Sequence, residues 1–426
     1  MKFIVIGITD NPQPYFPPEV MEVISHGQVF SGGKRHHEIM APLLPDGAEW
    51  IDITVPLDAV FQCYAQHFSR QPETLIVFAS GDPLFFGFAN TIRRKLPDAQ
   101  VVVYPAFNSL QMLAHRLVMP YHDLRIVSLT GRPWHEFDRA LIERAPKLGV
   151  LTDREHTPAA IARRMLDYGY TNYNMSVGEH LGNPSAEVVG TFALNEAAQR
   201  DFTHPNCLIL TKTVEASSGQ KVEPRLPESR PFGIPEGNFA LLDGREKMIT
   251  KMPIRLLSLQ ALDLPQRHVL WDIGFCTGSV SIEARLLFPH LHVVSFEVRP
   301  ECEAIIHENA RRFGAPGIEV HIGDFLSAAC DDIVAASSRP DAVFIGGHGG
   351  HLLDIMAKVK PWLAPGGVIV MNSVSSAVVD RMTARPSSRQ QFDEACRSLG
   401  LVQQPPLHIA LNDFNPIEIL KCELPS

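Results

Sequence analysis

The sequence predicts an α/β protein built from two domains, and three observations lead to this prediction. Short apolar runs of strand length alternate with helix-like stretches over the first 212 residues. The same alternation resumes at about residue 240 and continues to the end of the chain. Between the two parts, prolines and glycines are frequent from 213 to 239, as in a semi-rigid extended linker. We therefore expect domains at 1–212 and 240–426, joined by a linker at 213–239.

Size and composition agree with this organisation and exclude several classes of protein. A chain of 426 residues is too long for one ordinary core, and 45% hydrophobic with 20% charged residues is typical of globular proteins. No apolar run approaches the roughly 18 residues that a membrane span needs. The start of the chain, Met1–Gly7, predicts a strand and not a signal peptide, so we expect a cytoplasmic protein.

The cysteine pattern and the net charge indicate which compartment and which binding partners to expect. The seven cysteines include no C-x-x-C pair, which suits a reducing compartment and argues against disulfides and structural zinc. The net charge of −9 disfavours a nucleic-acid-binding surface. We expect no nucleic acid, no membrane and no metal, but a small-molecule substrate and a homo-oligomer.

In the first domain, eight apolar runs have the length of buried strands. A helix is also expected from Thr157-Pro158 to Leu166, because a threonine N-cap followed by proline is a strong helix start. The predicted strands are Phe3–Ile8, Glu49–Ile53, Leu75–Ala79, Val101–Tyr104, Leu124–Leu129, Leu148–Leu151, Tyr173–Val177 and Cys207–Leu210.

The second domain is organised around the stretch from Val269 to Glu283, which predicts a buried strand, a tight glycine turn and a helix. Pro365-Gly366-Gly367 turns into a later strand of the same domain. The predicted strands are Val269–Trp271, His292–Phe296, Ile318–Ile322, Ala342–Ile345, Val368–Met371, and two after Pro405-Pro406, near His408–Leu411 and Ile417–Cys422.

Acidic residues and glycines stand at the predicted strand ends of this domain. Gly274 and Gly278 are four apart, so they do not form the G-x-G-x-x-G of pyrophosphate-binding folds. An acidic residue about 20 positions beyond such glycines is where ribose hydroxyls are usually held, and Glu297 has that place. Together with Asp272 and Asp324, the pattern resembles the S-adenosylmethionine site of Rossmann-like methyltransferases. An ordinary α/β core with turn glycines is the alternative.

In the first domain, the strand ending at Ala79 runs into Ser80-Gly81-Asp82-Pro83, and strand ends of open α/β sheets are where ligands bind. A plain Asp-Pro turn would explain this motif alone. Further motifs follow in order: Val5-Ile-Gly7, Gly32-Gly-Lys-Arg-His-His37, Ser109-Leu-Gln111, Thr130-Gly-Arg132, Leu151-Thr-Asp153 and Glu179-His-Leu-Gly182. Together they resemble the tetrapyrrole methylase family, in particular members that act late in cobalamin synthesis.

The second domain resembles methyltransferases of the same pathway through Thr250-Lys251, Trp271–Gly274, Gly278–Glu283 and Asp341–Gly347. The resemblance implies a fused enzyme that uses S-adenosylmethionine once in each domain. It implies methylation of C-5 in the first domain, and methylation of C-15 with decarboxylation of the C-12 acetate in the second, on a precorrin-6B-type tetrapyrrole. The implied cofactor-binding residues are Gly7, Ser80, Gly81, Asp82, Pro83 and Ser109, and then Asp272, Gly274, Gly278, Glu297, Asp324 and Gly346.

Some positions depart from the pattern of these families. Residues 8 to 12, Ile-Thr-Asp-Asn-Pro, stand where a glycine-rich loop is usual, and Thr130 replaces a common histidine. Phe275 and Cys276 replace small residues, and Pro253 stands where an acidic residue is common. These departures concern contacts with the substrate and leave the cofactor class unchanged.

The implied substrate carries several carboxylates, so basic residues near the sites are candidates for binding it. These candidates are Lys34, Arg35 and His36 in the first domain, and Lys251 and Arg255 in the second; a solvated charge cluster is the alternative. His348 and His351 lie beside Gly346-Gly347, but the sequence suggests no third ligand that would complete a metal site with them. No catalytic residue is predicted, because sulfonium methyl donors and enamine-like ring carbons need mainly positioning and exclusion of water.

Two other functions fit the same pattern. An enzyme with both cofactor sites could act on RNA or protein, although the acidic balance and the lack of a basic, aromatic-interleaved stripe disfavour RNA. A tetrapyrrole-binding scaffold without activity is the third possibility. The sequence leaves open whether the substrate already contains cobalt.

Overall fold

The computed structural model describes residues 1–70, 74–213, 226, 230–245, 248–374, 387–411 and 415–425. Its contacts divide the chain into two compact units. The first unit comprises Met1–Arg132, Pro146–Arg164 and Asn172–Ser217, and the second comprises Pro133–Ala145, Met165–Thr171 and Ser218–Ser426. No helix in the described part of the chain is long and apolar enough to cross a membrane.

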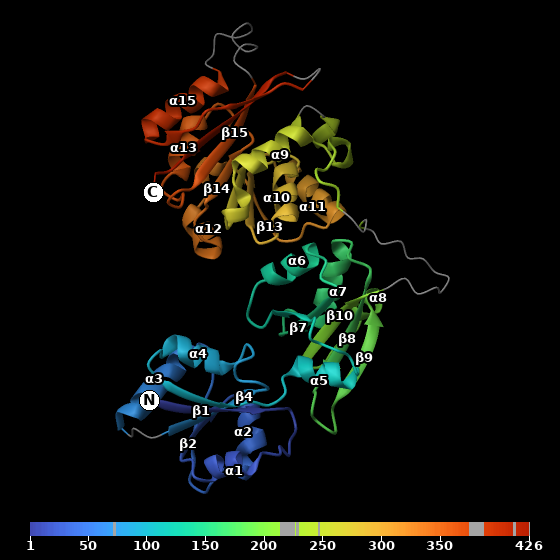
Figure 1. The fold of residues 1–426 in the computed structure, drawn as a ribbon, viewed down its shortest axis with the longest axis vertical. Helices are drawn as coiled ribbons and strands as arrows, with labels where there is room; N and C mark the ends of the chain where they lie inside the picture. Colours follow the sequence, from blue (N-terminus) through green and yellow to red (C-terminus); the bar gives the residue numbers. More distant parts are fainter. Residues whose placement is uncertain are drawn as a thin grey trace, which may run out of the picture. The chain divides into compact units, whose positions relative to one another are not determined.

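The first unit begins with a sheet of five parallel strands in the order β3-β2-β4-β1-β5 (Figure 1). Alternate residues of β1 point to opposite faces: Phe3 and Val5 pack with α3 and α4, and Ile4 and Ile6 pack with α1 and α2. The elements are β1 (Lys2–Ile8), α1 (Pro18–Ser25), β2 (Val29–Gly32), α2 (Lys34–Met40), η1 (Ala41–Leu43), β3 (Glu49–Asp52), α3 (Leu57–Arg70), β4 (Thr74–Ser80), α4 (Phe88–Lys95) and β5 (Gln100–Tyr104).

A second sheet of the first unit is mixed and has the order β6-β7-β10-β8-β9. Leu110 and Leu113 of α5 pack on it against Cys207 and Ile209 of β10. Asn108 caps α5, since its side chain accepts from the Gln111 N–H and the Gln111 side chain returns the bond. The elements are α5 (Ser109–Arg116), β6 (Arg125–Ser128), β7 (Lys147–Leu151), α7 (Pro158–Asp167), β8 (Tyr173–Glu179), β9 (Val188–Ala193), α8 (Leu194–Ala197) and β10 (Asn206–Lys212).

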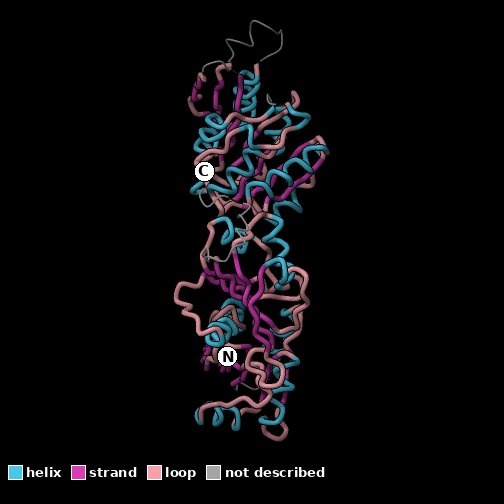
Figure 2. Tube along the Cα trace, turned by 90° about the vertical axis from the view of Figure 1, so that its right-hand side faces the viewer, coloured by secondary structure: helices cyan, strands magenta, loops and turns pink. Residues whose placement is uncertain are grey.

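The second unit is a doubly wound sheet in the order β13-β12-β11-β14-β15-β18-β16, with β17 beside β18. Helices α12, α13 and α15 cover one face and α9, α10 and α11 the other (Figure 1). Figure 2, coloured by secondary structure, shows the strands of this unit with helices beside them. The strands are β11 (Val269–Ile273), β12 (His292–Glu297), β13 (Ile318–Ile322), β14 (Ala342–Ile345), β15 (Val368–Val374), β16 (Val402–Gln403), β17 (Leu407–Ile409) and β18 (Ile417–Glu423). The helices are α6 (His135–Ile142), η2 (Glu236–Asn238), η3 (Leu242–Gly244), α9 (Met252–Ala261), η5 (Leu264–Gln266), α10 (Ser279–Leu287), α11 (Glu301–Phe313), η6 (Phe325–Ser327), α12 (Cys330–Ser337), α13 (Leu352–Val359) and α15 (Ser388–Leu399).

The end of the predicted linker packs into the second unit. Ile234 and Phe239 are buried in its core, and the Ile234 N–H donates to Glu283 Oε1 at 2.9 Å. Residues 230–239 therefore belong to a folded segment, whereas 214–225 and 227–229 lie outside the described residues. The extended-linker prediction falls mainly on that part.

All strands predicted from the sequence are present, with ends that differ by at most three residues. Three further strands, β2, β9 and β16, escaped prediction. β2 has four residues and ends at a glycine pair, β9 alternates exposed and half-buried positions, and β16 has only two residues. Segments that are this short, or that a glycine interrupts as Gly190 does β9, carry little periodic signal.

Candidate active sites

In the first unit, glycines allow the carboxyl ends of neighbouring strands to meet. The Gly81 N–H donates to Ile8 O at 2.7 Å, joining the ends of β1 and β4. A Cβ on Gly7 would lie 2.0 Å from Gly81 O, so only glycine fits there. Gly81 has φ +63°, and a Cβ on it would lie 2.9 Å from Asn108 Cα at the start of α5. The predicted glycines thus shape the backbone of the site.

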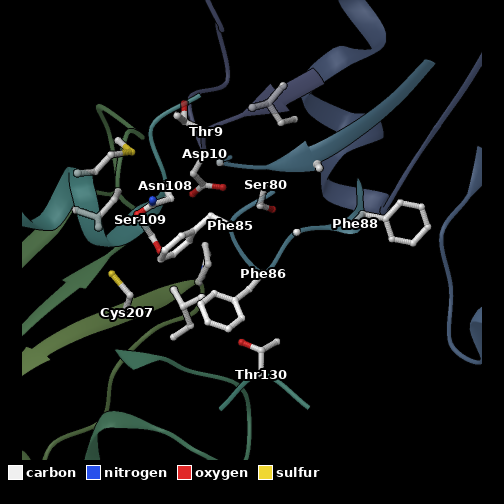
Figure 3. A pocket seen from close by; sticks show the side chains of 18 of the residues that line it. Thr9, Asp10, Ser80, Phe85, Phe86, Phe88, Asn108, Ser109, Thr130 and Cys207 are labelled. Carbon is white, nitrogen blue, oxygen red and sulfur yellow. The ribbon is translucent and has the colours of Figure 1, made fainter. Parts of the chain in front are cut away.

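Beside these strand ends lies a cavity of about 520 Å³, lined by residues from both sheets of the first unit. Of the predicted cofactor residues, Ser80, Gly81 and Ser109 line it, whereas Gly7, Asp82 and Pro83 do not. Figure 3 shows Asp10 and Ser80 on one side and Thr130 on the other, with Phe85 and Phe86 between them.

Asp82 and Pro83 shape the loop that carries these two phenylalanines. The Asp82 side chain accepts from the Leu84 N–H at 2.8 Å, and its carbonyl accepts from the Phe85 N–H at 3.0 Å. This closed turn places Phe85 and Phe86 in the cavity wall. The two residues predicted as ligands are therefore indirect contributors.

A polar network fixes Ser80. Arg35 bridges Asp10 and Ser80, with Nη1 3.1 Å from Asp10 Oδ1 and Nη2 donating to Ser80 Oγ at 2.9 Å. His36 Nε2 also lies 2.9 Å from Ser80 Oγ, and His180 Nδ1 lies 2.9 Å from Asp10 Oδ2. Two of the predicted substrate-binding residues, Arg35 and His36, thus line the cavity, whereas Lys34 is exposed at the start of α2 and does not line it.

Burial and the charge of Arg35 lower the pKa of His36 to about 4, so its ring is neutral near pH 7. The Gly33 N–H donates to His36 Nδ1 at 3.3 Å, which leaves the ring proton on Nε2. That proton and the Arg35 guanidinium then both point to Ser80 Oγ. The Ser80 hydroxyl proton is consequently free to reach an acceptor in the cavity.

In the second unit, two glycine loops meet backbone to backbone at the end of β11. The Gly274 N–H donates to Phe296 O at 2.7 Å, and the Gly346 N–H donates to Ile273 O at 2.8 Å. A Cβ on Gly274 would lie 2.6 Å from Gly347 N, and one on Gly346 would lie 2.8 Å from Gly274 O. Gly278 caps α10 with φ +73° and contacts Ile306 of α11.

Glu297, at the end of β12, reaches back to this turn. Its Oε2 accepts from the Cys276 N–H at 3.0 Å, and its Oε1 accepts from the Val298 N–H at 2.9 Å. The Arg299 side chain also donates to both oxygens, with Nε 2.9 Å from Oε1 and Nη2 2.8 Å from Oε2. Burial would raise the pKa of Glu297, but the bonds from Arg299 outweigh it and hold the pKa below its usual value.

Asp272 is 1% exposed and faces α10, where the Ser281 hydroxyl donates to its Oδ2. Its Oδ1 has no hydrogen-bond partner among the described residues. Burial raises the pKa of Asp272 to about 7, despite the bond from Ser281. This unpaired oxygen is itself buried beside the glycine turn, and a buried carboxyl oxygen without a hydrogen bond is costly unless a ligand or a donor reaches it.

Asp324 caps η6, since its side chain accepts from the Leu326 N–H at 3.0 Å. It lines a hollow of about 390 Å³ with Phe296 and His321, next to the end of β12. The structure therefore gathers the predicted residues of the second unit around the ends of β11, β12, β13 and β14. Among the described residues, no group of three His, Cys, Asp or Glu side chains is arranged to hold a metal.

The two basic residues predicted at the entry of the second unit have different surroundings. Lys251 is half-buried before α9. Arg255 is fully buried, pairs with Glu283, and donates to Thr250 O at 2.7 Å and to Ile234 O. Its guanidinium also lies over Phe239, 5.1 Å from the ring centre. We assign Arg255 a structural role in place of the predicted substrate contact, because no part of it reaches solvent.

Sequence reasoning missed several residues of these sites. Asp10 and His180 meet across 170 positions, so no local pattern links them. Phe86 follows the Asp82-Pro83 motif closely, and Arg132 is part of the Thr-Gly-Arg motif, so each could have been proposed from the sequence. That both residues line one cavity is visible only in the structure. Arg299, two residues after Glu297, could have been proposed as its partner.

Known protein families match both parts of the chain. Residues 2–197 match the model of tetrapyrrole (corrin/porphyrin) methylases, and residues 243–389 match that of a precorrin methyltransferase domain. A Salmonella typhimurium cobalt-precorrin-6B C(15)-methyltransferase (decarboxylating) is 32% identical over 184 residues, 43% of this chain and 92% of the relative. A cobalt-precorrin-7 C(5)-methyltransferase of the same species is 28% identical over 177 residues, 42% of this chain and 84% of the relative.

One relative spans both parts. A precorrin-6Y C(5,15)-methyltransferase (decarboxylating) from Sinorhizobium is 31% identical over 373 residues, which cover 87% of this chain and 84% of the relative. The order of the two matched domains agrees with the resemblance found in the sequence. The chain therefore belongs to the family of precorrin-6Y C(5,15)-methyltransferases (decarboxylating).

Proposed function

We propose that this S-adenosylmethionine-dependent methyltransferase methylates C-5 of a precorrin-6B-type tetrapyrrole in its first unit. Its second unit methylates C-15 and removes the carboxyl group of the C-12 acetate. The division is supported by two relatives, each matching less than half of the chain, one named for C(15) and the other for C(5) methylation. It is also supported by the two separate sets of strand-end residues described above.

The first unit has groups that fit S-adenosylmethionine. Ser80 offers a hydroxyl proton, because Arg35 and His36 occupy its oxygen. Gly81 offers backbone at a strand end, and Ser109 begins the capped helix α5. The same cavity has apolar walls at Phe85 and Phe86, which suit the flat face of a macrocycle.

The second unit fits the same cofactor through different chemistry. Asp272 has a buried oxygen without a hydrogen-bond partner among the described residues, and Glu297 can accept from ribose hydroxyls once Arg299 moves away from it. Gly323 and Gly347 have open space where a Cβ would stand, so backbone can approach a ligand closely there. We propose one molecule of S-adenosylmethionine per unit, held by these groups.

The reaction asks little of acid or base groups. S-adenosylmethionine supplies an activated methyl group, and the meso carbons of a reduced tetrapyrrole are enamine-like nucleophiles. The residues of this chain then act mainly by holding the reacting atoms in line and excluding water. Decarboxylation breaks the bond between the acetate methylene and its carboxylate; the electron pair passes into the conjugated ring, and a proton replaces the lost carbon dioxide.

The observation that carries this proposal is the presence of two independent strand-end sites, each with its own glycines and polar groups. Titration calorimetry of the full chain with S-adenosylmethionine tests it. Two binding sites per chain are expected, and Gly81→Val should remove one of them while Gly274→Arg removes the other. A single site, lost in both variants, would refute the division.

A further inference from the structure

Two arginines of the first unit, Arg94 and Arg132, form no ion pair with any residue in the described part of the chain. By contrast Arg35, which also lines the main cavity, is paired with Asp10 at 3.1 Å. Arg94 and Arg132 are both exposed, and they lie in the same hollow. Two guanidinium groups turned toward one hollow without a carboxylate partner indicate an anionic ligand.

This hollow, of about 330 Å³, is an extension of the main cavity. The two share Phe85, Phe86, Gly87 and Arg132 as lining. A ligand that fills the main cavity and is wide enough can therefore extend a side arm past Phe86 to the arginines.

Phe86 is held in an unusual conformation at the boundary of the two spaces. Its φ is +53°, which is unfavourable for a residue with a side chain, and the side chain is 46% exposed. The loop is tied on both sides, because Phe85 N–H donates to Asp82 O at 3.0 Å and Asn90 Nδ2 donates to Leu84 O at 2.7 Å. Backbone strain that keeps a large apolar ring exposed points to a ligand contact.

The Arg132 guanidinium carbon lies 4.9 Å from the centre of the Phe86 ring. Stacking on a ring uses the face of the guanidinium and leaves its in-plane N–H groups free, which is the geometry that binds a carboxylate with two hydrogen bonds. Figure 3 shows the Phe86 ring inside the cavity, on the side of Thr130. An apolar ring beside two cations suits a flat, apolar molecule with acidic arms.

We propose that Arg94 and Arg132 bind a carboxylate arm of the tetrapyrrole, while Phe86 contacts its macrocycle. This assignment rests on the proposed function of the first unit, which supplies a substrate with acidic arms. It adds residues that determine how that substrate is oriented relative to C-5.

The test compares three variants of the full chain: Arg94→Gln, Arg132→Gln and, as a matched control, Arg93→Gln. Arg93 is the neighbour of Arg94 on α4, is also exposed, and lines neither space. The measurements are the KM and kcat for C-5 methylation of a precorrin-6B-type tetrapyrrole, and the affinity for S-adenosylmethionine by calorimetry.

We expect the KM for the tetrapyrrole to rise roughly tenfold in Arg94→Gln and in Arg132→Gln, because each variant loses a hydrogen bond between charged groups. The affinity for S-adenosylmethionine and all constants of Arg93→Gln should be unchanged. Arg132→Lys should recover only part of the loss, because lysine restores the charge but not the stacked, planar donor.

An unchanged KM in both variants would overturn the proposal, and so would weaker binding of S-adenosylmethionine with an unchanged KM, since the arginines would then hold the cofactor carboxylate. Absence of C-5 methylation in the wild-type chain would reject the proposed function of the first unit, and the arm site with it.

Discussion

Replacing Glu297 by glutamine tests the cofactor site of the second unit at its most connected residue. The Glu297 side chain is 2% exposed and accepts from the backbone N–H groups of Cys276, Val298 and Arg299. It also holds the Arg299 side chain through both oxygens. Glutamine has the same shape but keeps a single acceptor oxygen, and its amide group turns a donor toward other donors.

The size of the effect follows from the bonds that are lost. A hydrogen bond to a charged acceptor is worth about 1.5–3 kcal/mol. Losing one such bond to the ribose corresponds to roughly tenfold to hundredfold weaker binding of S-adenosylmethionine at this site. The bonds to Cys276 and Arg299 are weakened as well, so we expect a loss of about 1–3 kcal/mol in the free energy of unfolding.

The assay is titration calorimetry of the full chain, with denaturant unfolding as the check of the fold. Glu319→Gln is the matched control, because Glu319 is exposed on the neighbouring strand β13 and pairs only with His321 among the described residues. One of the two classes of site should weaken in Glu297→Gln, and C-5 methylation should stay at the wild-type rate. Unchanged affinity at both sites in a folded protein would refute the placement of the cofactor at Glu297.

Three further predictions concern other residues of the two units. Gly81→Val should abolish C-5 methylation in a folded chain while C-15 methylation continues, because Gly81 has φ +63° and a Cβ there would lie 2.9 Å from Asn108 Cα. Mass spectrometry of the product tests this, and loss of both methylations together would contradict it. S-adenosylmethionine should bind the second unit more tightly as the pH rises through about 7, since burial raises the pKa of Asp272 to about 7 and only the charged carboxylate attracts the cationic cofactor. Calorimetry at several pH values should show this trend in the wild type and no such trend in Asp272→Asn. Arg255→Met should lower the free energy of unfolding by about 3–5 kcal/mol, because it removes the charged partner of the buried Glu283 carboxylate. At temperatures where this variant is folded, the KM for the tetrapyrrole should be that of the wild type, and a raised KM with normal stability would return Arg255 to the substrate site.

The sequence was sufficient for the sheets because their strands are continuous apolar runs. Val269–Ile273 is buried at all five positions, as a central parallel strand requires. The glycine turn after it and the acidic residue after the next strand were also predictable, because each depends on local backbone geometry. β9, Val-Val-Gly-Thr-Phe-Ala, was missed although most of its residues favour strands, because Gly190 interrupts the apolar residues.

The side-chain arrangement of the sites could be predicted only in part. Arg35 and His36 were expected at the cavity from their place after a glycine pair, but their shared contact with Ser80 depends on the packing of α2 beside β4. Arg255 was predicted to bind the substrate, but it is buried because Ile234 and Glu283, which come from distant segments, pack around it. Contacts between residues far apart in the chain produce no periodic pattern in a single sequence, so they could not be predicted from it.

Mass spectrometry of the product formed from a precorrin-6B-type tetrapyrrole and methyl-labelled S-adenosylmethionine tests the central claim most directly. The full chain should add two labelled methyl groups and remove one carbon dioxide. Gly274→Arg fills the glycine turn of the second unit, where a Cβ already lies 2.6 Å from Gly347 N, so its product should carry at most one labelled methyl group and keep the carboxyl group. A wild-type product with only one labelled methyl group, or loss of carbon dioxide that persists in folded Gly274→Arg, would contradict the account.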